Sequence, residues 1–173
     1  AKNDILRAMA GSTWGCDKEL IINTFKALGR SSLNYAAPVW TPFLSDTAWS
    51  RLQAAQNSAL RIATGSTRML QISHQHTETR ILPVKDHNEL LSTQFLLSTT
   101  VPDHPCGGIL KTELPPRVMR HTLSQNYGQK VRFFTNDNNI SSKQDYRKNL
   151  TILHTDAVIR SKLNYEHNKV LGA

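Results

Sequence analysis

The stretch SDTAWSRLQAAQNSALRIATG, residues 45–65, decides the fold because it carries the clearest helical pattern in the chain. Ser45 or Asp46 is a suitable N-cap, since a short polar side chain there accepts a hydrogen bond from a free amide of the first turn. Gly65 follows the last residue of the pattern, where glycine commonly ends a helix. The stripe expected to face the core comprises Trp49, Leu52, Gln56, Ala59, Leu60 and Ala63, and the opposite polar face comprises Arg51, Asn57, Ser58 and Arg61.

Shorter helical patterns precede this segment. Residues 2–9 predict a helix that stops at Gly11. Asp17 is a candidate N-cap for a second helix, and Gly29 either ends that helix or lies inside a longer one. The apolar face of this second helix is predicted to contain Ile21, Phe25 and Leu28, with Leu33, Ala36 and Ala37 as its extension.

Prolines mark the next boundaries. Pro38 and Pro42 bracket residues 39–41, which are predicted to form a non-helical corner with a buried Trp40. Residues 65–81 are predicted to be a loop, and Pro83 to open another helix. That helix has the stripe Val84, His87, Leu91 and Phe95, widened by Leu90 and Leu97. The large side chains expected in the core are Trp14, Phe25, Trp40, Trp49, Leu60 and Phe95.

The fold class predicted from these patterns is mainly α, a helical bundle with long loops and a less regular C-terminal part. Three regions are expected: a helical region at residues 1–98, a Pro/Gly-rich connector at 99–116 and a basic helical region at 117–173. The chain has 173 residues, of which 39% are hydrophobic, which suits a single globular domain.

Several classes of protein are disfavoured by composition. The longest apolar runs are three or four residues, far short of a membrane span, and the first residues lack the apolar segment of a signal peptide. Cys16 and Cys106 cannot form a disulfide framework, so an intracellular, reducing compartment is expected. The net charge of +8 favours a polyanionic partner, with nucleic acid ahead of a membrane surface.

Catalytic chemistry has little support in the sequence. The chain contains no phosphate-binding loop, no nucleophile elbow and no pair of adjacent aspartates. His74 and His76, or His104 and Cys106, form close pairs, but neither pair has the further ligands that a zinc site needs. We therefore expect no catalytic residue, no metal site and no cofactor.

Basic residues offer a better indication of function. Arg51 and Arg61 lie on the polar face of the 46–63 helix, and a second group surrounds the expected helix after Pro116. Side chains of this type contact phosphates, and the interleaved aromatic residues could stack on unpaired bases or belong to the core. The predicted nucleic-acid-binding residues are Arg51, Arg61, Arg117, Arg120, Lys130 and Arg132, and the interleaved aromatics are Tyr127, Phe133 and Phe134.

Several runs of the chain resemble one family in order. These are LRAMAGSTWGC (6–16), LNYAAPVW (33–40), LQAAQNSALR (52–61), TG (64–65), ILPVK (81–85), LSTQFLL (91–97), HTDAV (154–158) and NKVLG (168–172). They are similar to non-LTR (LINE-type) retrotransposon reverse transcriptases of the jockey-like clade, in the thumb and C-terminal connector downstream of the catalytic palm.

This resemblance implies a function for the chain as part of a larger polyprotein. In the family, the helical thumb grips the template–primer duplex by its backbone, and residues 1–98 would be that thumb-like region. The palm motif with adjacent aspartates, which binds the catalytic magnesium, would precede residue 1, so the chain is expected not to be an enzyme on its own. The expected partners are the backbone of RNA or an RNA–DNA hybrid and the rest of the reverse transcriptase, in a nuclear or cytoplasmic ribonucleoprotein.

One alternative belongs to a different functional class. A domesticated copy could serve as a protein-interaction, scaffold or effector module that keeps only the fold and self-associates through exposed apolar helix faces. Salt-sensitive nucleic-acid binding distinguishes the first interpretation from the second, because phosphate contacts release counterions and apolar contacts do not.

Overall fold

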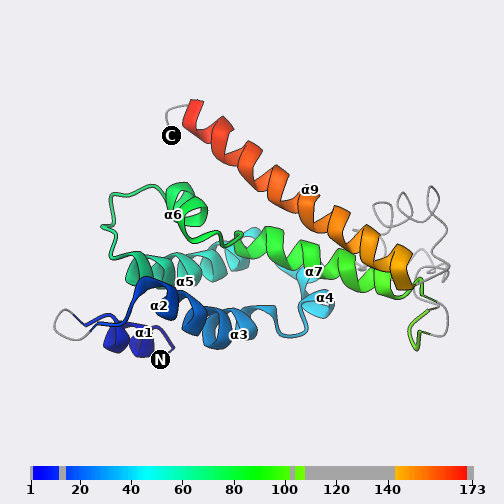
Figure 1. Cartoon of the computed structure of the whole chain (residues 1–173), viewed down its shortest axis with the longest axis horizontal. Helices are drawn as coiled ribbons and strands as arrows, with labels where there is room; N and C mark the ends of the chain where they lie inside the picture. The colour runs from blue at the N-terminus through cyan, green and yellow to red at the C-terminus, as the bar shows by residue number, and fades with distance from the viewer. Residues whose placement is uncertain (1, 12–14, 102–103, 108–142, 171–173) are drawn as a thin grey trace. The chain divides into compact units, whose positions relative to one another are not determined.

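The chain is mainly helical, as predicted, and no strand occurs among the described residues (Figure 1). The computed structural model describes residues 2–11, 15–101, 104–107 and 143–170. The elements are α1 (Lys2–Met9), α2 (Lys18–Thr24), the π-helix η1 (Phe25–Arg30), α3 (Ser31–Asn34), α4 (Ala37–Trp40), the 3-10 helix η2 (Thr41–Phe43), α5 (Asp46–Thr64), α6 (Ile72–Thr79), α7 (Val84–Ser98) and α9 (Lys143–Val170).

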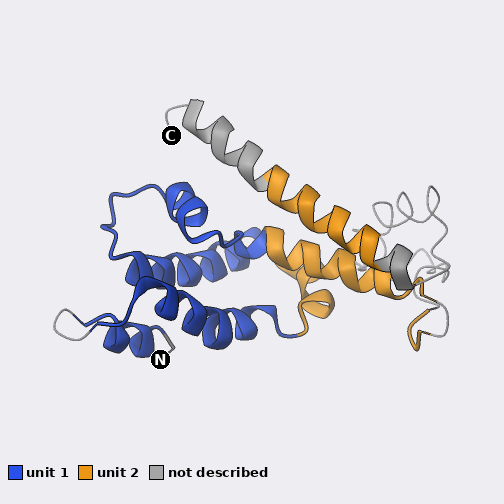
Figure 2. Ribbon diagram, viewed as in Figure 1, with its two compact units in different colours: residues 1–35, 45–85, 161–173 blue, residues 36–44, 86–160 orange. Residues whose placement is uncertain are grey.

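These elements belong to two compact units (Figure 2). Unit 1 comprises residues 1–35, 45–85 and 161–173, and unit 2 comprises residues 36–44 and 86–160. Helix α7 passes from unit 1 into unit 2 after Lys85. The expected division into three consecutive regions stays a prediction, because most of the 99–116 connector and residues 117–142 lie outside the described residues.

Helix α5 begins and ends where the sequence predicts. The Ser45 hydroxyl accepts a hydrogen bond from the Ala48 amide (3.3 Å), which satisfies one of the free donors of the first turn. Gly65 ends the helix with a left-handed φ of 63°, a conformation that costs glycine little. Helix α1 likewise matches its predicted range.

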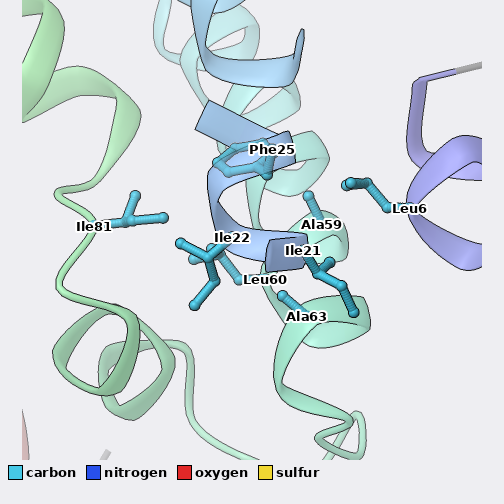
Figure 3. Packing of buried hydrophobic residues seen from close by; sticks show 8 residues of the cluster. All are labelled: Leu6, Ile21, Ile22, Phe25, Ala59, Leu60, Ala63 and Ile81. Carbon is cyan, nitrogen blue, oxygen red and sulfur yellow. The ribbon is translucent and has the colours of Figure 1, made fainter. Parts of the chain in front are cut away.

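The apolar core of unit 1 forms where α5 packs against α1, α2 and η1 (Figure 3). Leu6 and Ile81 point into the cluster from opposite sides of this view, toward the side chains of α2 and α5. Of the predicted core residues, Phe25, Trp49 and Leu60 are buried, Trp40 and Phe95 are half-buried, and Trp14 lies outside the described residues. The cluster comprises Leu6, Ile21, Ile22, Phe25, Ala59, Leu60, Ala63 and Ile81.

Gly29 does not end the second helix; the helical path continues through η1 and α3. A Cβ built on Gly29 would lie 2.6 Å from Cδ2 and Cε2 of Phe25, so the absence of a side chain lets the Phe25 ring lie over the backbone. Leu28, expected on the buried face with Ile21 and Phe25, is exposed. The extra residue per turn in a π-helix rotates the following side chains away from the α-helical register.

Two local predictions were wrong. Residues 37–43 form α4 and η2 rather than a non-helical corner, because Pro38 and Pro42 occupy first-turn positions, where proline fits a helix. Residues 72–79 form α6 rather than part of a loop. The buried side chains of α6 are Gln75 and Thr79, so the helix has no apolar stripe for a sequence pattern to detect.

Several polar side chains are buried in the described part of unit 2. On α7, Asn88 and Ser92 are fully buried, and Phe95 is half-buried with its ring edge-on to His104 (6.5 Å between ring centres). The Ser92 hydroxyl donates to the Asn88 carbonyl (2.8 Å), which satisfies the hydroxyl inside the helix. The buried face of α7 in unit 2 is therefore centred on Asn88, Ser92 and Leu96, one position along from the predicted stripe.

The close approach of Phe25 to Gly29 gives a first prediction. Gly29→Ala should destabilise the protein by about 1–3 kcal/mol, although alanine favours helices, because the new methyl group forces the buried ring to move. Urea unfolding followed by circular dichroism measures the change. Lys26→Ala, at an exposed position of η1, is the matched control and should leave the midpoint unchanged. An equal midpoint for Gly29→Ala and wild type would contradict this account of the packing.

Candidate nucleic-acid interface

Two of the six predicted phosphate-binding residues lie in the described part of the chain, both on α5. Arg51 is exposed and Arg61, in the last turn, is half-buried. Their ten-residue separation corresponds to about 15 Å along the helix axis. The described part of the predicted interface is therefore α5 and its surroundings in unit 1. Arg117, Arg120, Lys130 and Arg132, with Tyr127, Phe133 and Phe134, lie outside the described residues.

Arg61 ends a row of side chains that runs along α5. Trp49, Gln53, Asn57 and Arg61 are spaced four residues apart, so successive members are neighbours on the helix surface. A shallow groove of about 360 Å³ runs beside the first three. Its lining residues are Trp49, Ser50, Gln53, Ala54, Asn57 and Lys85.

The groove combines an exposed cation with polar side chains. Lys85 is exposed in the first turn of α7. Arg51 follows Ser50 directly in the sequence and precedes Ala54 by three residues, so it lies beside the groove lining on the same helix. A cation and hydrogen-bonding groups around an open groove suit an extended, negatively charged ligand.

Gln53 holds the groove in shape. Its Oε1 accepts a hydrogen bond from the Val84 amide (2.9 Å), which satisfies a free donor at the start of α7. Its Nε2 donates to Asn57 Oδ1 (2.7 Å) and contacts His76 Nε2 (3.0 Å). One amide therefore connects α5, α6 and the start of α7, next to Lys85.

The same contacts define the state of His76. Because Gln53 Nε2 is a donor, His76 Nε2 acts as the acceptor, and the ring proton is on Nδ1, which donates to the Ile81 carbonyl (2.8 Å). His76 is therefore a neutral part of the structure. His74 lies two residues earlier on the same helix and is exposed, so the two rings do not share a face as they would in an extended segment.

The prediction that Asn57 lies on the polar face of α5, opposite the core, was wrong, because its side chain is buried. It is 5% exposed, because α6 and the segment before α7 cover this side of the helix and its carbonyl oxygen is bonded to Gln53. The Gln–Asn spacing of four residues is a known stabilising pair in helices, and this signal was present in the sequence.

Sequence patterns also missed Arg30, which is buried at the end of η1. Its Nη2 donates to the Leu82 carbonyl (3.2 Å), which also accepts from Gln56 Nε2 (2.9 Å). Burial lowers the pKa of Arg30 from its ordinary value to about 10, so the side chain is still a cation at neutral pH. No ion pair to Arg30 occurs within the described residues.

The segment between Asp46 and Glu78 carries charge of one sign. Residues 47–77 contain Arg51, Arg61 and Arg68 and no aspartate or glutamate. The next carboxylate in the chain, Glu78, forms an ion pair with Lys18. The positive potential of this surface is therefore not neutralised from within the segment.

The structure also bears on metal binding and on membrane-spanning helices. Within the described residues, no three His, Cys, Asp or Glu side chains are grouped so that they could hold a metal ion. None of the described helices has the length and apolar character needed to cross a membrane.

No protein-family model, curated protein or solved structure matches the chain.

The hydrogen bonds of Gln53 give a second prediction. Gln53→Met keeps the size of the side chain but leaves the Val84 amide, Asn57 Oδ1 and His76 Nε2 without their partner, so we expect a loss of about 2–3 kcal/mol in the free energy of unfolding. Urea titration measures it. Thr47→Met, at an exposed position of the same helix, is the control. A Gln53→Met protein as stable as this control would show that the three hydrogen bonds contribute nothing.

Arg30 gives a third prediction. Its lowered pKa means that folding disfavours the cation, so Arg30→Met should unfold at a higher urea concentration than wild type, with a gain of about 1 kcal/mol. The gain should be constant between about pH 6 and pH 9, where both folded and unfolded wild type are protonated, and should shrink above about pH 10 as the folded form loses its proton. Arg7→Met, in an exposed ion pair, is the control, and a stability loss in Arg30→Met would contradict the prediction.

Proposed function

We propose that the chain is a noncatalytic nucleic-acid-binding segment, derived from the thumb and connector region of a jockey-like non-LTR retrotransposon reverse transcriptase. It binds the sugar–phosphate backbone of RNA or an RNA–DNA hybrid. On this proposal the catalytic aspartates and their magnesium belong to another part of a larger polyprotein, and the complex is an intracellular ribonucleoprotein.

The observation that carries the proposal is the uncompensated charge of residues 47–77. A segment with three arginines and no carboxylate of its own favours contact with a polyanion, whereas charged residues of both signs are usually interspersed. Arg51, the exposed member on α5, is next to a groove edged by Lys85. Lys85 lines the groove and Arg51 neighbours the lining residue Ser50 in the sequence, so we expect both cations to contact one strand.

The polar groups in the groove lining offer little for base readout. The side-chain oxygen and nitrogen of Gln53 both make hydrogen bonds within the protein. The Ser50 hydroxyl likewise donates to the Asp46 carbonyl (3.0 Å). Few side-chain groups are left to read base edges, while the cations contact phosphates irrespective of sequence. The proposed binding is therefore sequence-independent.

A fluorescence anisotropy titration with an RNA–DNA hybrid at several salt concentrations is the test. We expect affinity to fall steeply as salt rises, because each phosphate contact releases counterions. Arg51→Gln and Arg61→Gln should each reduce the slope of log K against log salt by about 0.9, with little change in the thermal unfolding midpoint.

Arg7→Gln is the matched control, because it removes the same charge from unit 1 at a residue that is ion-paired with Asp4 (2.7 Å). A slope that drops equally in Arg7→Gln would mean that only net charge matters. Absence of binding at low salt would overturn the proposal. A stable oligomer with a salt-independent mass would then favour the scaffold or effector module.

A further inference from the structure

An exposed apolar tip lies between α5 and α6. The segment comprises residues 66–72 and is named here the tip loop. Met69 is 94% exposed, Leu70 37% and Ile72 40%. Arg68, directly before Met69, is also exposed. A methionine almost fully in water next to two further apolar side chains is unfavourable for an isolated protein and is typical of a contact surface.

The base of the tip loop is held by hydrogen bonds. The Thr64 hydroxyl donates to the Leu60 carbonyl (2.9 Å), so the Ser66 hydroxyl donates to Thr64 Oγ1 (2.8 Å) and in turn accepts from Gln75 Nε2 (3.0 Å). Gln75 is fully buried on α6. Every hydroxyl proton at the base thus has one partner, and the loop starts from a defined position in unit 1.

The charge around the loop indicates its partner. The loop belongs to the acid-free segment 47–77, with Arg68 inside it and Arg61 one turn before Gly65. An apolar side chain next to cations, in a segment without carboxylates, is complementary to a nucleic acid, which combines phosphates with apolar base faces. An anionic lipid surface is the less favourable occupant, because membrane binding scales with buried apolar area and, of the three apolar side chains of the tip, Met69 alone is more than half exposed.

We propose that the tip loop is a wedge that inserts Met69 between adjacent bases of a nucleic-acid duplex, while Arg68 and Arg61 hold the flanking phosphates. The inference rests on the proposed function. It adds that the bound nucleic acid is a duplex and that the protein locally unstacks its bases. Methionine is long, unbranched and adaptable, and apolar wedges of this type open base steps in duplexes that proteins bend.

The experiment uses the full chain and an RNA–DNA hybrid with 2-aminopurine placed in its DNA strand, titrated in parallel for anisotropy and for 2-aminopurine fluorescence. Unstacking raises the fluorescence of this base. We expect wild type to raise it on binding and Met69→Ser to lose most of the rise, with an affinity about fivefold weaker from the lost apolar contact. The salt slope should be unchanged in Met69→Ser and lower by about 0.9 in Arg68→Gln.

Leu20→Ser is the matched control, since Leu20 is 51% exposed on α2 of the same unit and outside the tip loop. It should behave as wild type in both readouts. Because Met69 contributes almost no buried surface, Met69→Ser should keep the wild-type thermal midpoint, which circular dichroism checks.

Each other outcome overturns the wedge. If wild type binds the hybrid without a fluorescence rise, or Met69→Ser keeps the full rise, the wedge is wrong and the proposed function still stands. If wild type does not bind the hybrid at low salt, both fail. Binding to vesicles of anionic phospholipid that Met69→Ser abolishes, without base unstacking, would assign the tip to a lipid surface, and a Met69-dependent dimer in sedimentation would assign it to a second copy of the chain.

Discussion

The buried side of α5 is the constraint on which unit 1 depends. Ala59 and Leu60 are completely removed from solvent, and the small side chains of Ala59 and Ala63 let α1 and α2 approach the helix backbone closely. Burying a leucine side chain contributes about 1.5–3 kcal/mol. The Asn3 side chain also donates to the Ala55 carbonyl (3.4 Å), so α1 contacts α5 through both apolar and polar groups. The position of α5 in turn fixes the positions of Arg51 and Gln53.

A second side of α5 is buried by polar rather than apolar contacts. Gln53 and Gln56 bind the segment before α7 through its backbone, at Val84 and Leu82, and His76 fastens α6 to the same segment at Ile81. Hydrogen bonds of this kind contribute little in net free energy but cost much when one partner is lost. They therefore specify one arrangement of α5, α6 and the start of α7, including where Lys85 lies.

Prediction from sequence succeeded where apolar periodicity and caps coincide. Residues 46–64 have both signals, and Ser45, Gly65 and Leu60 have the roles predicted for them. It missed α6, whose buried side chains Gln75 and Thr79 are polar. It found α7 and its buried Leu90 and Leu97, but not the buried polar residues Asn88 and Ser92. A pattern of hydrophobic residues cannot detect a helix whose contacts are hydrogen bonds, because the same residues are usual on solvated surfaces.

The candidate site likewise has a part that the sequence predicted and a part that it did not. The choice of Arg51 and Arg61 needed only their place on one helix, and the helix formed as predicted. The groove and Arg30 could not be predicted, because they depend on how the chain between α6 and α7 returns to α5, a tertiary contact with no local signal. The tip loop could not be predicted for a different reason: in a sequence Met69 resembles an ordinary core residue, and only its exposure in the folded structure distinguishes it from one.

Charge and stability are coupled in this unit. Folding disfavours the buried Arg30 cation, and no ion pair to it occurs within the described residues, so this charge lowers the stability of unit 1. A polyanion that binds only the folded state adds stability in proportion to the logarithm of its concentration over Kd. On the proposed function, a bound nucleic acid therefore stabilises unit 1 while it neutralises the arginines of residues 47–77.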